Sequence, residues 1–163
     1  MTDNFIQLKK DDVLRLAIKT ADGKETGEIL EFDLEDIELP LKYQEVIEKD
    51  KKNKEYLRNQ LLIIDKRQDV NTKNKLLSKN QEDKIKAIND FFRREIEIYN
   101  GFLGKNGVQK LLNGRKIGWT SLQEIDEIIS KQIAPYLDLK MDKIADKIKG
   151  IYSQAGKEKD EIL

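Results

Sequence analysis

The most informative stretch of this chain is GFLGKNGVQKLLNGRKIGW, residues 101–119. It holds five of the nine glycines of this 163-residue chain and its only tryptophan. Glycines gather where the backbone turns sharply or takes a positive φ, so the stretch predicts a structured turn between helices. Val108 to Asn113 resembles a short helix, with Gly114 placed to end it in the left-handed conformation. We call residues 101–119 the glycine-rich corner.

Toward the N-terminus, residues 1–38 predict an acidic β-hairpin. Apolar and polar residues alternate in two runs, at 13–19 and 28–34, with Asp22-Gly23 between them. Asp-Gly between alternating runs is a strong hairpin signal. An isolated hairpin is only marginally stable, so we expect its apolar face to pack on the helices or on another chain.

Residues 39–100 predict two longer helices separated by a polar loop near 65–80. Pro40 suits the first turn of the first helix, whose apolar positions then recur at helical spacing. The middle of this helix is almost wholly polar, so we expect it to project or to be held by i,i+4 ion pairs. Ser78 and Gln81 predict a capping box at the start of the second helix.

Residues 101–153 predict the glycine-rich corner and the C-terminal helices. Ser121 and Glu124 predict a further capping box, and Ala134-Pro135 is expected to end or kink the helix that follows. A last helix comes next, and residues 154–163 predict a frayed tail. The chain is therefore expected to be one α+β domain, residues 1–163, with an N-terminal β-hairpin followed by a mostly α-helical bundle of about four helices.

Composition excludes several kinds of chemistry. The chain has no Cys and no His, which removes thiol nucleophiles, zinc sites built from these residues and Ser-His triads. We expect no enzyme activity, no cofactor and no metal. No apolar run is long enough for a membrane span and no export signal is visible, so a cytoplasmic protein without a membrane partner is expected.

Charge is balanced overall but unevenly placed. Lys and Arg number 31, as do Asp and Glu, and the acidic excess lies in the first 40 residues. Acidic residues cluster near 33–38 and 124–127, but without the convergence that a metal or hydrolase site needs, so a solvated surface is the preferred interpretation. The basic run at 66–86 is interrupted by acids and carries no aromatic residues for base stacking, which makes nucleic-acid binding a weak alternative.

Five residues of the glycine-rich corner are candidate corner-fixing or partner-contact positions: Phe102, Gly104, Gly114, Arg115 and Trp119. The glycines superficially resemble a phosphate-binding loop, but the segment follows a helix where a P-loop follows a strand, so a structural role is preferred. Trp119 is either a core anchor or a partner contact, because Trp is enriched at binding hot spots. Arg115 is a candidate for a buried or interfacial ion pair.

Several short motifs carry a family resemblance. These are FLG at 102–104, GR at 114–115 and WTSL at 119–122, together with LEFDL at 30–34 and LPLKY at 39–43. In this order they resemble the tail assembly chaperones of phages and prophages of Gram-positive bacteria. The polar loop at 65–80 has no counterpart in that pattern.

The resemblance implies a non-enzymatic protein of the host bacterial cytoplasm. It implies binding to the tape-measure protein during tail assembly, with the tail tube protein as a second candidate partner, and absence from the finished virion. Some members of the family also have a longer form made by a ribosomal frameshift. Two alternatives stay open: a structural or adaptor subunit of a phage particle, and a nucleic-acid-binding regulator. Self-association and the binding face also stay open.

Overall fold

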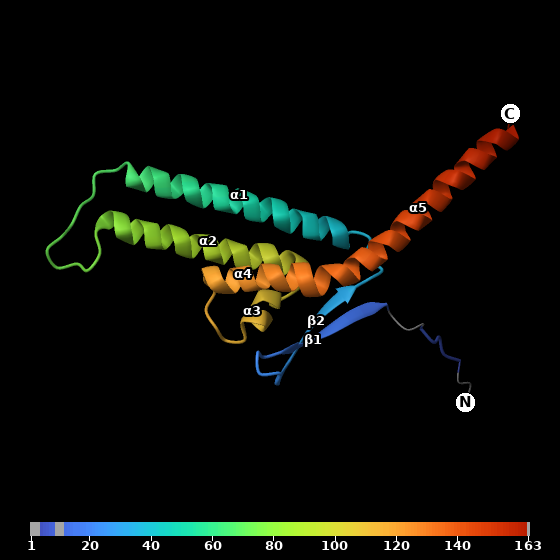
Figure 1. Cartoon of the computed structure of the whole chain (residues 1–163), viewed down its shortest axis with the longest axis horizontal. Helices are drawn as coiled ribbons and strands as arrows, with labels where there is room; N and C mark the ends of the chain where they lie inside the picture. The colour runs from blue at the N-terminus through green and yellow to red at the C-terminus, as the bar shows by residue number, and fades with distance from the viewer. Residues whose placement is uncertain (1–3, 9–11, 163) are drawn as a thin grey trace.

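The computed structural model describes residues 4–8 and 12–162, without the side chains of 138–141, 143 and 155–162. The described residues form a two-stranded antiparallel hairpin followed by five α-helices, which confirms the expected α+β class. Figure 1 shows two long helices lying side by side, a third helical layer over part of their length, and the hairpin at one end.

The hairpin forms where the alternating runs predicted it. Strand β1 (Val13–Lys19) pairs with β2 (Glu25–Asp33), and Leu16 lies opposite Leu30. Gly23 has a φ of 81° in the connecting turn, a conformation that glycine adopts without strain. Leu30 and Phe32 are buried, so β2 packs its apolar face on the helices of its own chain.

Helices α1 (Leu39–Asp65) and α2 (Lys79–Leu103) form an antiparallel pair. The two begin as the sequence predicted, with Pro40 in the first turn of α1 and a capping box between Ser78 and Gln81 at α2. The polar middle of α1 does not project, because Asn53 is buried against α2. Two i,i+4 ion pairs, from Lys49 and Lys54, lie on the same helix.

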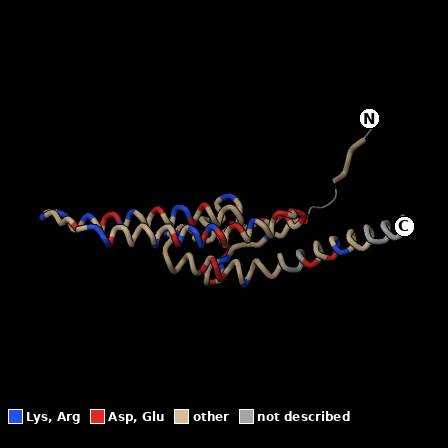
Figure 2. The backbone as a smooth tube through the Cα atoms, turned by 90° about the horizontal axis from the view of Figure 1, so that it is seen from above, with Lys and Arg blue, Asp and Glu red and all other residues tan. Residues whose placement is uncertain are grey.

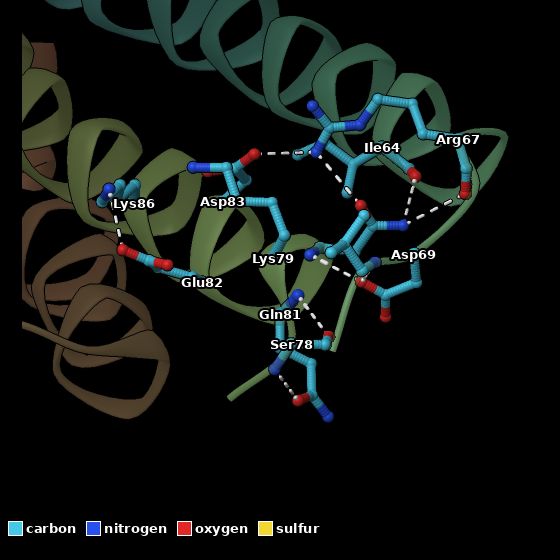
Figure 3. A network of polar contacts seen from close by, with 11 residues as sticks. Ile64, Arg67, Asp69, Ser78, Lys79, Gln81, Glu82, Asp83 and Lys86 are labelled. Atoms are coloured by element: carbon cyan, nitrogen blue, oxygen red, sulfur yellow. Dashed lines mark hydrogen bonds and ion pairs between the residues drawn. The ribbon is translucent and has the colours of Figure 1, made fainter. Parts of the chain in front are cut away.

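The polar loop between α1 and α2 is tied down at both ends (Figure 3). Asn80 donates from its side-chain amide to the backbone oxygens of Ile64 and Arg67, at 3.1 and 3.2 Å. Asp69 accepts from the backbone N–H of Asn80 at 3.0 Å, and Arg67 pairs with Asp83 at 2.8 Å. These contacts join the end of α1 to the start of α2, so the loop closes the helix pair rather than acting as a loose linker.

The glycine-rich corner contains α3 (Gly107–Leu112) and leads into α4 (Trp119–Ile128). Asn113 and Gly114 both have positive φ, 50° and 83°, which ends α3 as expected. The capping box predicted from Ser121 and Glu124 is wrong. The helix starts two residues earlier, at Trp119, and Ser121 Oγ accepts from the backbone N–H of Gly118 at 2.8 Å.

The expected break at Ala134-Pro135 is replaced by a change in helix type. Helix α4 passes into a π-helical turn, η1 (Ile129–Ile133), and then directly into α5 (Ala134–Ile162) (Figure 1). Proline cannot donate the usual i→i−4 hydrogen bond, and the widened turn just before Pro135 accommodates this without ending the helix. Helical backbone continues to Ile162, beyond the predicted start of a frayed tail at 154, because no proline interrupts it.

We predict that alanine substitutions at two glycines of the corner, Gly101 and Gly107, change the stability of the fold in opposite directions. A Cβ at Gly107 would collide with Cβ of the buried Leu103, whereas a Cβ at Gly101 meets nothing within 4 Å. Gly107→Ala is therefore expected to lower the free energy of unfolding by about 1–3 kcal/mol. Gly101→Ala, which lies inside α2, is expected to raise it by up to about 1 kcal/mol. Urea unfolding of both variants measures this, and a stabilising Gly107→Ala would contradict the packing described here.

Candidate functional site

Phe102 fixes the corner to the hairpin and to α1. Its side chain is 4% exposed, and its ring centroid lies 5.4 Å from that of Phe32 and 5.3 Å from that of Tyr43. The next residue but one, Gly104, takes a φ of 93° and ends α2. Phe102 and Gly104 therefore hold the position where the chain leaves α2, and the Phe102 side chain is buried.

Arg115 ties α3 to α4. Its Nε donates to the backbone oxygen of Leu112 at 2.9 Å and its Nη2 to that of Leu111 at 3.3 Å. Nη1 pairs with Glu124 Oε2 at 3.1 Å. The guanidinium thus satisfies carbonyls at the end of α3 while contacting the second turn of α4, which is a corner-fixing role on the surface of the molecule.

Trp119 serves as a core contact on one side and is exposed on the other. Its ring centroid lies 4.7 Å from that of Phe92 and 5.3 Å from that of Phe91, yet the residue is 55% exposed. The two phenylalanines beneath it are buried. The predicted core contact is therefore present, and the role of Trp119 as a partner contact stays a prediction.

Apolar side chains of α2 extend the exposed apolar surface that begins at Trp119. Trp119 opens α4 beside Phe91 and Phe92, and Asp126 farther along α4 contacts Tyr99, so α4 runs parallel to the second half of α2. The first half of α2, residues 79–90, therefore extends roughly 18 Å past the start of α4. Ile85 and Ile88 lie on the same face of α2 as Phe92. Ile85 is 52% exposed, and Ile88 is partly buried.

We call Ile85, Ile88 and Trp119 the Trp119 ledge. The ledge continues the apolar face of α2 beyond the start of α4, which covers the second half of that face. Two packed helices with a third over only half their length leave room for another helix in the uncovered half. Figure 1 shows this half of the pair reaching past α4 toward the polar loop.

The sequence did not reveal a buried polar cluster between α1 and α2. Glu95 is 0% exposed and Asn53 is 7% exposed. The side-chain amide of Asn53 donates to Glu95 Oε1 at 2.8 Å and to the backbone oxygen of Phe91 at 3.1 Å. Asp50 also approaches Glu95 and forms an ion pair with Lys54 at 2.9 Å.

The cluster reaches α4 through Tyr99. Its hydroxyl donates to Asp126 Oδ1, and burial together with this hydrogen bond raises the pKa of Tyr99, so the phenol stays protonated. Burial raises the pKa of Glu95 to about 8, and the hydrogen bond from Asn53 only partly opposes it. A perturbed carboxyl often marks a functional site, but Glu95 is fully buried between helices and lines neither the surface groove beside Asn53 nor the cavity of about 90 Å³ beside Asp50.

The other charged clusters are accounted for by structural contacts. Asp33 and Asp36 accept from backbone N–H groups at the start of α1, and Asp36 also pairs with Lys42 at 2.8 Å. Within the described part of the chain, no group of three or more acidic residues is arranged to hold a metal ion. None of the helices described combines the length and apolar character that a membrane crossing requires.

The basic run at 66–86 is largely neutralised by neighbouring acids. Arg67 and Lys79 pair with Asp83, Lys86 pairs with Glu82 and Lys84 with Asp65. Along the two long helices the two signs of charge are interspersed (Figure 2). This pattern differs from the continuous basic surface that tracks a phosphate backbone.

Comparison of the chain with protein-family models, with curated proteins and with solved structures finds no significant match.

Arg115→Ala is expected to lower the free energy of unfolding by about 0.5–1.5 kcal/mol, because it removes the link between α3 and α4. Arg115→Lys keeps the charge but not the planar fork, so it should recover less than half of this loss. The matched control is Arg93→Ala, which breaks an exposed i,i+3 contact to Asp90 at 3.5 Å and should change little. Equal urea midpoints for Arg115→Ala and Arg93→Ala would contradict a corner-fixing role for Arg115.

Proposed function

We propose that this chain is a non-enzymatic assembly chaperone that holds a helical segment of a phage tape-measure protein. The observation that carries the proposal is the Trp119 ledge, an apolar strip beside an uncovered half of a helix pair. The ordered resemblance of the sequence to tail assembly chaperones supports the choice of partner. The protein would act in the host bacterial cytoplasm, before the tail tube is built.

The proposed mode of binding is completion of a helical layer. An amphipathic partner helix would lie along residues 79–90 of α2, in line with α4, and bury the Trp119 ledge. Its apolar face would contact Ile85 and Ile88, while the exposed ring of Trp119 would pack against its end. Tape-measure proteins are elongated and helical, so they offer repeated segments of this kind.

Two other functions compete with this proposal. A structural or adaptor subunit would use the same apolar strip permanently, and mass spectrometry would then detect the chain in purified virions. A nucleic-acid-binding regulator is less favoured, because four of the seven basic side chains at 66–86, those of Arg67, Lys79, Lys84 and Lys86, form ion pairs with neighbouring acids. The tail tube protein remains a further candidate partner.

The proposal predicts that Ile85→Glu and Trp119→Ser abolish the ability of the chain to keep the tape-measure protein soluble during co-expression. A charge at Ile85 would have to be desolvated under the partner helix, and loss of the indole removes its largest apolar contact. The matched control is Leu41→Glu, an equally exposed apolar position, 59%, near the opposite end of the helix pair. Circular dichroism checks that each variant is folded.

Three results would contradict the proposal. The first is a tape-measure protein that is equally soluble with and without this chain. The second is a folded Ile85→Glu variant that still protects it, and the third is loss of protection by Leu41→Glu alone.

A further inference from the structure

Two carboxyl oxygens in the bundle centre are buried without a hydrogen-bond partner, Asp50 Oδ1 and Glu95 Oε2. The other oxygen of each carboxyl is used, since Asp50 Oδ2 pairs with Lys54 and Glu95 Oε1 accepts from Asn53. The two carboxyls come within hydrogen-bonding reach of each other across the contact between α1 and α2. Two facing carboxylate oxygens repel each other, whereas one proton between them forms a hydrogen bond that satisfies both.

The charges around the pair also leave one negative charge unbalanced. Lys54 on α1 is the cation that contacts the pair, and it can compensate one carboxylate. Asp126 on α4 adds another negative charge nearby, and Tyr99 on α2 stays neutral. Lys49, Lys52 and Arg94 line a surface groove that also includes Asn53. A proton on the pair gives the smallest buried charge that this arrangement allows.

We propose that Asp50 and Glu95 form a proton-binding site, in which one shared proton joins α1 to α2 in the centre of the bundle. The proton lies between Glu95 Oε2 and Asp50 Oδ1, so the carboxylic acid on one helix donates to the carboxylate on the other. Its release to water leaves two facing carboxylates and one lysine. A cavity of about 90 Å³ lined in part by Asp50, Tyr99 and Asp126 lies beside the pair and provides a path for exchange.

The proton makes the stability of the helix pair depend on pH between about 4.5 and 8. The folded-state pKa of Glu95 is raised from 4.5 to about 8, chiefly by burial, so between these values the folded chain binds one proton more than the unfolded chain. Stability is therefore fully present below about pH 4.5 and is lost as the pH rises through about 8. Within the window the unfolding equilibrium constant should rise by up to about tenfold per pH unit.

Other carboxyls act in the opposite direction and at lower pH. Hydrogen bonds lower the pKa values of Asp36, Asp69, Glu82 and Asp83, with the largest contributions coming from Lys42, Ser78, Lys86 and Arg67, respectively. Their stabilising contributions are complete above about pH 5 and are lost only as the pH falls. They leave the range from about pH 5 to 8 to the pair.

Glu95→Gln imitates the protonated state. The glutamine oxygen can accept from Asn53 as Glu95 Oε1 does, and its amide can donate to Asp50 Oδ1. This variant should unfold with the same equilibrium constant throughout pH 5–9, while the unaltered chain weakens. Glu97→Gln, an exposed position one half-turn away on α2, should keep the full pH dependence and serves as the control.

The experiment is urea unfolding across pH 5–9 for the full chain and both variants, with a carbon-13 NMR titration of the glutamate and aspartate carboxyls. Titration of Glu95 near pH 8, together with a flat Glu95→Gln profile, supports the shared proton. The proposal is overturned if Glu95 titrates below about pH 5 in the folded chain. It is equally overturned if folded Glu95→Gln keeps the slope of the unaltered chain. Neither result depends on the tape-measure protein, so this proposal stands or fails separately from the proposed function.

Discussion

The contact between Asn53 on α1 and Glu95 on α2 is the constraint from which the rest of the structure follows. Apolar helix faces tolerate sliding by a turn, but a buried amide that donates to one carboxylate and one backbone oxygen fits a single alignment. A slip would leave Glu95 buried without its donor, at a cost of several kcal/mol. We interpret this contact as fixing the register of the helix pair, in the manner of a buried asparagine in a coiled coil.

With the register set, the ends of α2 determine the positions of the other elements. At its start, Asn80 and the Ser78 capping box close the loop from α1. At its end, Phe102 packs between the hairpin and α1, and the glycine-rich corner returns the chain so that α4 lies along α2. Because α4 starts beside Phe91 and Phe92, in the middle of α2, it covers only the second half of α2. The Trp119 ledge is exposed because the glycine-rich corner places the start of α4 at the middle of α2.

Much of this architecture could be predicted from sequence because its signals are local. The alternating runs, the Ser78 capping box and Gly114 each act within a few residues, and the hairpin, the start of α2 and the end of α3 were predicted correctly. The pairing of Asn53 with Glu95 depends on residues 42 positions apart, which a local pattern cannot reveal. A signal was present nonetheless: Glu95 falls at helical spacing between Phe92 and Tyr99, where an acid interrupts a buried stripe.

Predictions failed where two local signals competed. Ser121 suits an N-cap, but the extended backbone at Gly118 starts the helix first. Pro135 normally ends a helix, but the π-helical turn of η1 accommodates it. Of the five candidate residues, Phe102, Gly104, Gly114 and Arg115 hold the corner together. Only Trp119 also presents an exposed apolar surface, and its exposure depends on how far α4 extends, which no local pattern specifies.

Hydrogen exchange of the chain with and without the tape-measure protein tests directly whether the uncovered half of α2 receives a partner helix, as proposed. The proposal predicts that binding slows amide exchange in residues 79–90 and at the start of α4, with little change in the β-hairpin. Protection confined to the hairpin or to α5, with residues 79–90 unaffected, would contradict it.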